Sequence, residues 1–493
     1  MPAYGDFSQK RVVVCVVACA LGVGGCAGHA TTMQGVRDAL AQNDVEEARA
    51  RLAEAGKGTD DLLFALEDGL LVHYLGDYEL SNLRLEFAEQ RIDELYTKSL
   101  TRAAFSLLTS DLVLRFEPRG IDVFLINYYR ALNYYYLGEQ EEALVEWRKL
   151  ASKLQFSRDN GEELYYDPPF FDYLVGLGLE ADDPANAYVS LRLAEAGYRE
   201  RGRPPPPGLI DNLMRLAAYF GFTDHLLEYE RRYGSIGTAD RVAGRDGAAV
   251  DPGSPRGSSS SALEHRAVGE LVLFVEEGFV APIVEINAYI PILKKREKQA
   301  ASEDEERKFD LAMTLADEYA AGDYEHVTLA YEHAELAYIL PLAFPAPGFG
   351  SPAFDHLEFY VNSDTVSAEP ALLVSQLQME AFEDRLLGIY AKTIVRALLK
   401  YAAAEELEKK AEEETGNTGG DVMGFLTNAV NVLTERADTR AWLGLPHRIW
   451  VARLRLPPGL HDVTMQFGES ALVDLGVVEV RSGQRTFLGH RVF

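Results

Sequence analysis

The spacing of large apolar, small and turn-forming residues repeats along the first half of the chain and predicts pairs of helices. In the clearest copy, Gly138 follows Ala131 and Tyr134, and Ala143 and Trp147 come five and nine positions after the glycine. Small residues let two helices approach closely, and the glycine ends the first of them. Large residues then fill the seam with the next pair, so the pattern predicts a stacked helical hairpin.

Four further segments carry the same order of residues and extend the helical region over residues 35–235. Their markers are, in chain order, Asn43, Ala48 and Leu52; then Gly69, Gly76, Tyr78, Ser81, Leu85 and Ala88; then Asp182, Ala187, Leu191 and Ala194; and finally Gly221, Leu226 and Tyr229. These spacings resemble those of tetratricopeptide (TPR) repeats, which stack into a solenoid. We expect a TPR-like α-solenoid, and the alternative is a generic helical bundle.

Two polar residues of the clearest repeat are candidates for partner binding. Asn127 and Arg130 precede Ala131 on the predicted first helix, and in TPR-like stacking that helix lines the concave groove. An arginine offers a planar fork that suits a carboxylate or a carbonyl group. We therefore predict that Asn127 and Arg130 contact a partner in the groove. The tyrosines at 128–136 could line the same groove, but the simpler interpretation is that Tyr128, Tyr135 and Tyr136 pack in the seam between helices.

The periodicity ends after residue 235, and a region of different character follows. Residues 236–262 are rich in glycine, serine and charged residues and contain no aromatic residue. Such a composition cannot bury enough apolar surface to fold, so this segment is predicted to be a flexible linker. Residues 263–493 combine strand and helix patterns, which predicts a mixed α/β C-terminal domain and an α+β fold class for the chain.

Strand patterns begin and end this C-terminal domain, and a long helix lies between them. Residues 269–278 have the pattern of a buried strand, and residues 280–292 and 336–344 that of extended segments. The apolar stripe over 368–414 predicts a long helix, and 422–437 predicts a second helix that completes a helical hairpin. Apolar and polar residues alternate over 461–467, and with the strands expected at 449–456, 471–480 and 485–493 this predicts a small antiparallel β-meander.

The N-terminus has the features of a secretory signal. Lys10 and Arg11 precede an apolar run, and small residues at 23–25 come directly before Cys26. This arrangement resembles the bacterial lipoprotein lipobox, in which the cysteine carries lipid. We expect a signal peptide at 1–25, lipidation of Cys26 and a tether at 26–34. The alternatives are a second lipobox at Cys19, after a shorter apolar core, and a transmembrane helix, which needs about 20 apolar residues.

Charge and cysteine content narrow the classes of partner. The net charge of −29 opposes binding to nucleic acid and to anionic lipid headgroups. The membrane link is therefore expected to come from acyl chains alone. All three cysteines lie within residues 1–26, so a chain processed at Cys26 has no internal disulfide, no cysteine metal site and no cysteine nucleophile.

The sequence contains none of the familiar catalytic motifs. GxSxG, HExxH, P-loop and GxGxxG patterns are all missing. His326 and His333 lack a defined third metal ligand, and the acidic runs at 303–306 and 412–414 lack the spacing of a calcium loop. Arg440, Trp442 and Trp450 form either a binding joint or interdomain packing. We predict no catalytic residue, no metal and no cofactor.

Several blocks of the chain resemble an uncharacterised family of Gram-negative lipoproteins with TPR-like repeats. They are the lipobox at Cys26 and residues 127–150, 269–282, 392–404 and 437–459, whereas residues 296–335 depart from the family and look like an insertion. The resemblance implies a lipid-anchored protein on the periplasmic face of the outer membrane, since Ala27 is not an aspartate-type retention signal. It implies no established activity. Members are thought to be encoded beside lipoproteins that stimulate peptidoglycan synthases, which suggests a role in the cell envelope.

Two classes of function follow from these features. The first is a scaffold whose repeats bind other envelope proteins without catalysis of its own. The alternative is a cell-wall-acting enzyme or glycan-binding protein with its site in the C-terminal half. Carboxylates converging in a deep cleft there would favour the alternative, whereas the repeats and the missing motifs favour the scaffold.

Overall fold

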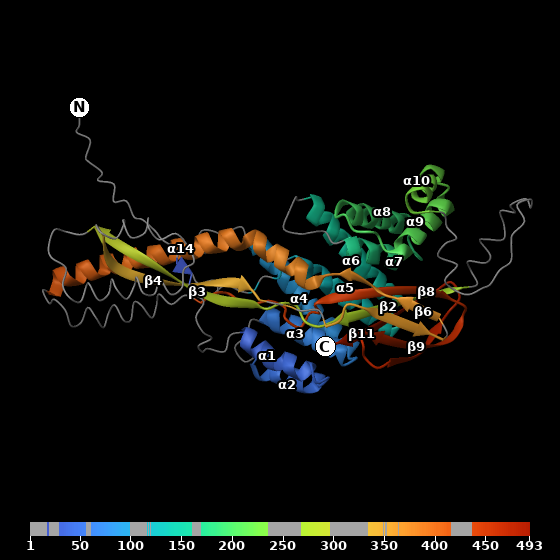
Figure 1. The fold of residues 1–493 in the computed structure, drawn as a ribbon, viewed down its shortest axis with the longest axis horizontal. Coiled ribbons are helices and arrows are strands. Elements are labelled where there is room, and N and C mark those ends of the chain that lie inside the picture. The colour runs from blue at the N-terminus through green and yellow to red at the C-terminus, as the bar shows by residue number, and fades with distance from the viewer. Residues whose placement is uncertain are drawn as a thin grey trace, which may run out of the picture.

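The computed structural model in Figure 1 describes the chain in several stretches, with gaps between them. These are residues 17–18, 29–55, 61–98, 116, 118, 120–159, 169–234, 268–295, 334–348, 350, 353–362, 364–415 and 436–493. Cys26 and the linker predicted at 236–262 lie outside the described residues. So does most of the second helix predicted at 422–437.

The N-terminal half is helical, and consecutive helices pack in pairs. The described helices are α1 (His29–Leu40), α2 (Val45–Ala55), α3 (Asp61–Tyr74), α4 (Tyr78–Lys98), α5 (Ile121–Leu137), α6 (Gln140–Asp159), α7 (Pro169–Leu179), α8 (Pro184–Glu200), α9 (Pro207–Phe220) and α10 (Thr223–Tyr233). The predicted helical region is confirmed, but it begins before residue 35. Residues 29–34 of the predicted tether belong to α1, where Met33 is fully buried.

The predicted turn and small positions fall where these helix pairs need them. Gly76, Gly138 and Gly221 have φ angles of +81°, +80° and +72° and lie between the two helices of a pair. This left-handed conformation costs glycine little and other residues more. Ala143 and Ala187 are fully buried on the second helices of their pairs, as close helix packing requires.

Two four-stranded sheets pack face to face in the C-terminal half. The first has the order β11-β2-β8-β7, and the second has the order β10-β9-β5-β6. The bounds are β2 (Gly269–Glu277), β5 (Leu357–Val361), β6 (Asp364–Ser367), β7 (Glu369–Leu372), β8 (Arg448–Leu456), β9 (Gly459–Phe467), β10 (Val473–Val480) and β11 (Arg485–Val492). Leu273 of β2, Ala452 of β8, Phe359 of β5 and Met465 of β9 belong to the core between them.

The last four strands exist as predicted, but they do not form a meander. The short turn after β8 leads into β9 in the other sheet, and β11 runs parallel to β2. The physical reason lies in β2, whose Val272 and Phe274 are buried on one face while Leu271 and Leu273 are buried on the other. A strand that is apolar on both faces takes a central position, and here it recruits both β8 and β11.

The first sheet is the middle layer of the molecule. Its outer face, with Val272 and Phe274, joins the same apolar core as the helices, and the Phe274 ring lies 6.0 Å from that of Tyr128 in α5. Its other face packs on the second sheet. In Figure 1 the helical array runs from α1 and α2 past this sheet to α9 and α10.

A long arm projects from this body (Figure 1). It consists of the antiparallel strands β3 (Ile283–Lys295) and β4 (Ala334–Pro347), with helix α14 (Val374–Thr415) packed on β4. The Tyr390 and Phe344 rings are 4.6 Å apart in this contact. The helix begins later than predicted, because residues 369–372 form β7 and pair with β8. A two-residue strand, β1 (Val17–Ala18), pairs with β3. Among the described helices, none is both long and apolar enough to cross a membrane.

Candidate functional site

The two predicted groove residues are buried inside the helical array. Asn127 is 0% exposed and Arg130 is 3% exposed. The Asn127 amide donates to Glu89 of α4 (3.1 Å) and to Glu146 of α6 (2.7 Å), and an Arg130 Nη donates to Glu89 (2.7 Å). Burial alone raises the pKa of Glu89, but Lys153 and its other cationic neighbours outweigh this and lower it to about 2. The open groove expected at these two residues is therefore corrected to a buried network of charges that joins three helices.

The first helices of the helix pairs are covered by the C-terminal half of the chain. In α1, the Arg37 guanidinium donates to the Leu443 carbonyl (3.0 Å). In α3, the Glu67 carboxylate accepts from the backbone N–H groups of Leu443 (2.7 Å) and Gly444 (2.9 Å). Helices α1 and α3 are each the first helix of a pair, and these contacts join both of them to the segment that leads into β8.

A buried carboxylate links α3 and α5 to the first sheet. Glu276 of β2 accepts hydrogen bonds from the hydroxyls of Tyr74 (2.8 Å), Tyr128 (3.2 Å) and Tyr129 (3.0 Å). Burial and the Glu276 charge hold the pKa values of these tyrosines well above their usual range, so their hydroxyls remain donors. Tyr128 therefore serves packing, as the simpler interpretation predicts, but it packs against the sheet and not only between helices.

Helix α7 is joined to the sheet by a second charged cluster. Arg453 of β8 and Arg485 of β11 both bind Glu270 of β2, and Arg485 also reaches Glu180 (3.2 Å) at the end of α7. Arg453 also donates to the Tyr173 hydroxyl. Burial acts to raise the pKa of Glu270, but the two arginines hold it well below its usual range. The face of α1, α3, α5 and α7 is thus occupied by the chain itself.

The two tryptophans singled out from the sequence also serve packing. Trp442 is fully buried, and its ring lies 6.2 Å from that of Tyr129. Trp450 is 3% exposed, and its indole N–H donates to Glu277 (2.7 Å). Arg440, the third residue of that group, instead lines an open cavity.

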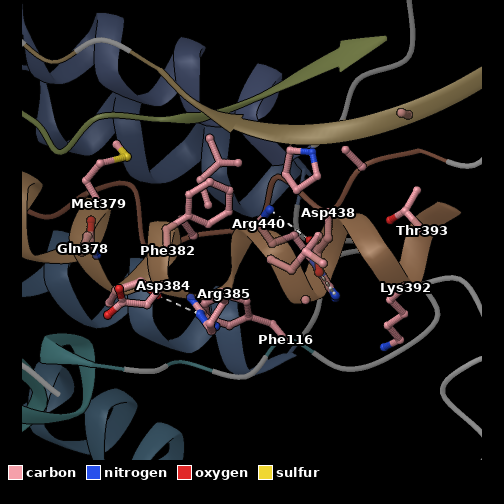
Figure 2. A pocket seen from close by; sticks show the side chains of 18 of the residues that line it. Phe116, Gln378, Met379, Phe382, Asp384, Arg385, Lys392, Thr393, Asp438 and Arg440 are labelled. Carbon is pink, nitrogen blue, oxygen red and sulfur yellow. Dashed lines mark hydrogen bonds and ion pairs between the residues drawn. The ribbon is translucent and has the colours of Figure 1, made fainter. Parts of the chain in front are cut away.

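That cavity has a volume of about 520 Å³ and lies where the arm joins the body. Its walls come from the first part of α14, from β3 and β4, from the segment 436–441 and from residues next to the start of α5. Figure 2 shows Gln378, Phe382, Arg385 and Lys392 on α14 and the Arg440–Asp438 pair on the neighbouring segment. A concave site of this size at the junction of two parts of a molecule is a common location for a ligand.

Cationic side chains outnumber carboxylates in the described lining of the cavity. The cations are Arg385, Lys392, Arg396, Arg436 and Arg440, and the carboxylates are Asp122, Asp384 and Asp438. Asp438 is held by Arg440 through a two-pronged ion pair with distances of 2.8 and 2.7 Å. This pair therefore cancels one of the lining carboxylates against one of the lining arginines.

Asp122 carries the most unusual carboxyl group of the cavity. It lies in the first turn of α5 and is 7% exposed, and Gln378 of α14 donates to it (2.6 Å). Burial raises its pKa to about 7, against the opposing effects of Gln378 and Arg385. Near neutral pH the group is therefore protonated about half of the time, which lowers the negative charge of the lining further.

Apolar side chains complete the cavity and come largely from the same helix face. Phe382 and Phe116 are 5% and 7% exposed, and Ile389 lies two turns after Phe382 on α14. The sequence predicted this helix and its apolar stripe but did not single out the cations. The signal was available, because Arg385, Lys392 and Arg396 are spaced by seven and four positions and so share one helix face.

No metal site accompanies these residues in the described part of the chain, where no cluster of histidine, cysteine, aspartate and glutamate is suited to hold an ion. His326, His333 and the acidic run at 303–306 lie outside the described residues.

Comparison with known proteins adds little to this description of the site. No model of a known protein family matches the chain, and no curated protein matches it. Among solved structures, the chain is similar to the apo form of RapI, with a TM-score of 0.31 and 14% sequence identity. The match covers 41% of this chain and 52% of that one.

Proposed function

We propose that this protein is a lipid-anchored scaffold on the periplasmic face of the outer membrane and binds other envelope proteins. The lipobox-like sequence before Cys26 supports the anchor, and the helix pairs with TPR-like spacing support the scaffold. A link to peptidoglycan synthesis is the role that the family resemblance suggests.

The observation that carries this proposal is a difference in accessibility: one face of the helices is covered, whereas the cavity at the base of the arm is open. The face of α1, α3, α5 and α7 is occupied by the first sheet and by the segment that leads into β8, through buried hydrogen bonds and ion pairs. The arm projects from the body, and an open cavity lies at its base (Figure 1, Figure 2). We therefore place partner contact at the cavity and the arm rather than in a concave helical groove.

The anchor is tested by replacing the lipidated residue. Cys26→Ser is expected to release the protein from membranes or to leave it unprocessed, because no sulfur remains to carry acyl chains. Cys19→Ser is the matched control and should change neither property. Unchanged fractionation and processing of Cys26→Ser would remove the lipoprotein part of the proposal.

The site of partner contact is tested by a photo-crosslinking residue at position 392 in the cavity wall. The control position is 477, on β10 of the second sheet, where Val477 is 60% exposed. We expect one envelope protein to be captured from position 392 and not from 477, and the same pair to form when the captured protein carries the crosslinker. Equal capture from both positions would argue against the cavity as the contact site.

One observation favours the alternative, a cell-wall-acting enzyme or glycan-binding protein. Asp122, with a pKa of about 7, lines the same cavity as Asp384 and Asp438, and a carboxyl group protonated near neutral pH suits a general acid. Release of soluble fragments from purified cell walls, lost in Asp122→Asn, would favour this alternative over the scaffold.

A further inference from the structure

We propose that the edge of β3 that faces away from β4, here called the β3 edge, binds an extended, apolar and β-branched strand of a partner protein. The inference rests on the proposed scaffold function and adds to it the way in which the arm holds a partner. It depends on three features of the arm: the positions of its prolines, the different protection of its two edges, and the strand that lies on one of them.

The prolines of the arm determine which peptide groups of β3 face away from β4. They all lie at alternate positions of the ladder, in the pairs Ile283–Pro347, Glu285–Pro345, Tyr289–Pro341 and Pro291–Ile339. A proline has no N–H group, so these are the pairs in which both residues turn their peptide groups away from each other. The hydrogen bond from the Gly348 N–H to the Pro282 carbonyl (2.7 Å) belongs to the other set of positions and agrees with this assignment. The N–H groups of Glu285, Asn287 and Tyr289 therefore point to the β3 edge.

The opposite edge, on β4, is protected against a further strand. Pro341, Pro345 and Pro347 are among the residues whose peptide groups face that edge, and none of them has an N–H group to donate. The Pro345 carbonyl there accepts a hydrogen bond from the Tyr390 hydroxyl of α14 (3.2 Å). Prolines and a covering helix both keep a strand edge from pairing. The β3 edge carries only Pro291, so it is the edge that can accept a strand.

A strand from the predicted signal peptide already lies on the β3 edge. β1 pairs with it in the antiparallel direction, with Val17 opposite Tyr289 and Ala18 opposite Ala288. Among the described strands, no other pairs with this edge. The sequence that contains β1 reads VVVCVVA over residues 12–18, and β-branched residues of this kind favour strands. The edge therefore accepts an uncharged strand rich in valine.

The proposed processing at Cys26 would take β1 away together with residues 1–25. The N–H groups of Asn287 and Tyr289 would then lose the described strand that lies beside them. An open strand edge is a template for another strand, and a strand added there is held mainly by main-chain hydrogen bonds. In the anchored protein, a partner strand with the chemistry of β1 takes its place.

The test uses the protein purified from membranes and a fluorescent peptide. The probe has the sequence of residues 12–18 with serine in place of Cys15, and lysines at both ends keep it soluble. Its matched control has the same charge but proline in place of Val17. In the protein, Tyr289→Pro removes an N–H group from the β3 edge, and Tyr289→Ala is the matched control because it also loses the tyrosine side chain. Circular dichroism confirms that each variant is folded, and mass spectrometry shows whether residues 1–25 have been removed.

We expect the processed protein to bind the probe at least about tenfold more tightly than the proline control, a difference of about 1.4 kcal/mol. Tyr289→Pro should bind the probe about fivefold more weakly than Tyr289→Ala, because one main-chain hydrogen bond is lost. Equal binding of the two peptides, or equal binding by the two variants, would overturn the inference. Dimers of the processed protein that exclude the probe would also contradict it, since a second copy would then occupy the edge.

The outcomes separate this inference from the proposed function. Partner capture from position 392 without binding of the probe would leave the scaffold in place and refute the docking of a strand. If residues 1–25 are still present in the purified protein, the lipoprotein part of the proposed function fails. The edge is then tested in the full chain with Val17→Pro, which should release β1 and strengthen binding of the probe about tenfold. Unchanged binding by that variant would refute the inference as well.

Discussion

Buried carboxylates recur where the helices meet the C-terminal half of the chain. Glu67 and Glu276 are 1% and 5% exposed, and each accepts hydrogen bonds from two or more donors on another element. Asp122 is a third buried carboxyl group, and it accepts a hydrogen bond from the amide of Gln378. Burial raises its pKa to about 7, which makes its contribution to the stability of the fold depend on pH.

Replacing Asp122 with asparagine should make stability less dependent on pH. The folded pKa of Asp122, about 7, lies above the ordinary value of 3.8, so its contribution to stability is full below about pH 4 and is lost as the pH rises through 7. An asparagine side chain does not titrate, and its carbonyl can still accept from Gln378. Relative to the unmodified chain, the variant should gain stability between pH 4 and 7, by at most about 4 kcal/mol. Parallel Tm values for both proteins at pH 5 and pH 8 would contradict this.

The close approach of α6 and α7 at Gly178 predicts that a single added methyl group there lowers the stability of the fold. A Cβ atom at Gly178 of α7 would overlap the Trp147 ring of α6, which is itself buried. Gly178→Ala should therefore destabilise the fold by about 1–3 kcal/mol. Gly388→Ala is the matched control, because it meets open space and improves helix propensity by up to about 1 kcal/mol. Thermal unfolding of both variants measures the difference, and equal Tm values would show that α6 and α7 are not in close contact.

At the scale of elements, α5 is covered on two sides. One side carries Asn127 and Arg130 against α4 and α6, and the other carries Tyr128 and Tyr129 against β2. Such a helix has no open face along this stretch, so polar residues on it serve the fold. The first sheet is likewise covered on both faces, which explains why its strands cannot be arranged from their own alternation alone.

Removing one tyrosine hydroxyl should measure the strength of the helix–sheet contact. Tyr129→Phe deletes a donor to the buried Glu276 carboxylate and keeps the ring, so we expect a loss of about 1.5–3 kcal/mol. Tyr219→Phe, at a residue that is 71% exposed, should change stability by less than about 0.5 kcal/mol. Urea unfolding compares the two, and similar midpoints would mean that the hydrogen bond to Glu276 contributes little.

At the scale of the whole molecule, the helices and the sheets form one folded unit. Hydrogen bonds and ion pairs from α1, α3, α5 and α7 cross to the C-terminal half, together with a shared apolar core. The linker predicted at 236–262 therefore connects two parts of the chain that noncovalent contacts also hold together.

Cutting the chain at that linker should not separate the two parts. Limited proteolysis is expected to cleave first between residues 237 and 261, because that composition cannot support a core. The two fragments should nevertheless elute together in gel filtration, and denaturant should be needed to part them. Separate elution without denaturant, or first cleavage elsewhere, would contradict this view.

By itself, the sequence determined the features that depend on local order. The helix pairs with their turn glycines, the long helix after residue 374 and the strands around 269–277 and 448–492 all follow from apolar periodicity and turn residues, which respond to burial along one element. The predicted signal at Cys26 is likewise a local pattern.

Only the tertiary structure decided what covers each face. Asn127 and Arg130 look like exposed groove residues in the sequence, because periodicity cannot tell a polar side chain in water from one in a buried network of charges. The same limit applies to β8, β9 and β11, whose alternation shows a buried face but not the neighbouring strand. The cavity also escaped prediction, since Asp122, Arg385 and Arg440 are far apart in the chain and meet only when the arm packs against the body.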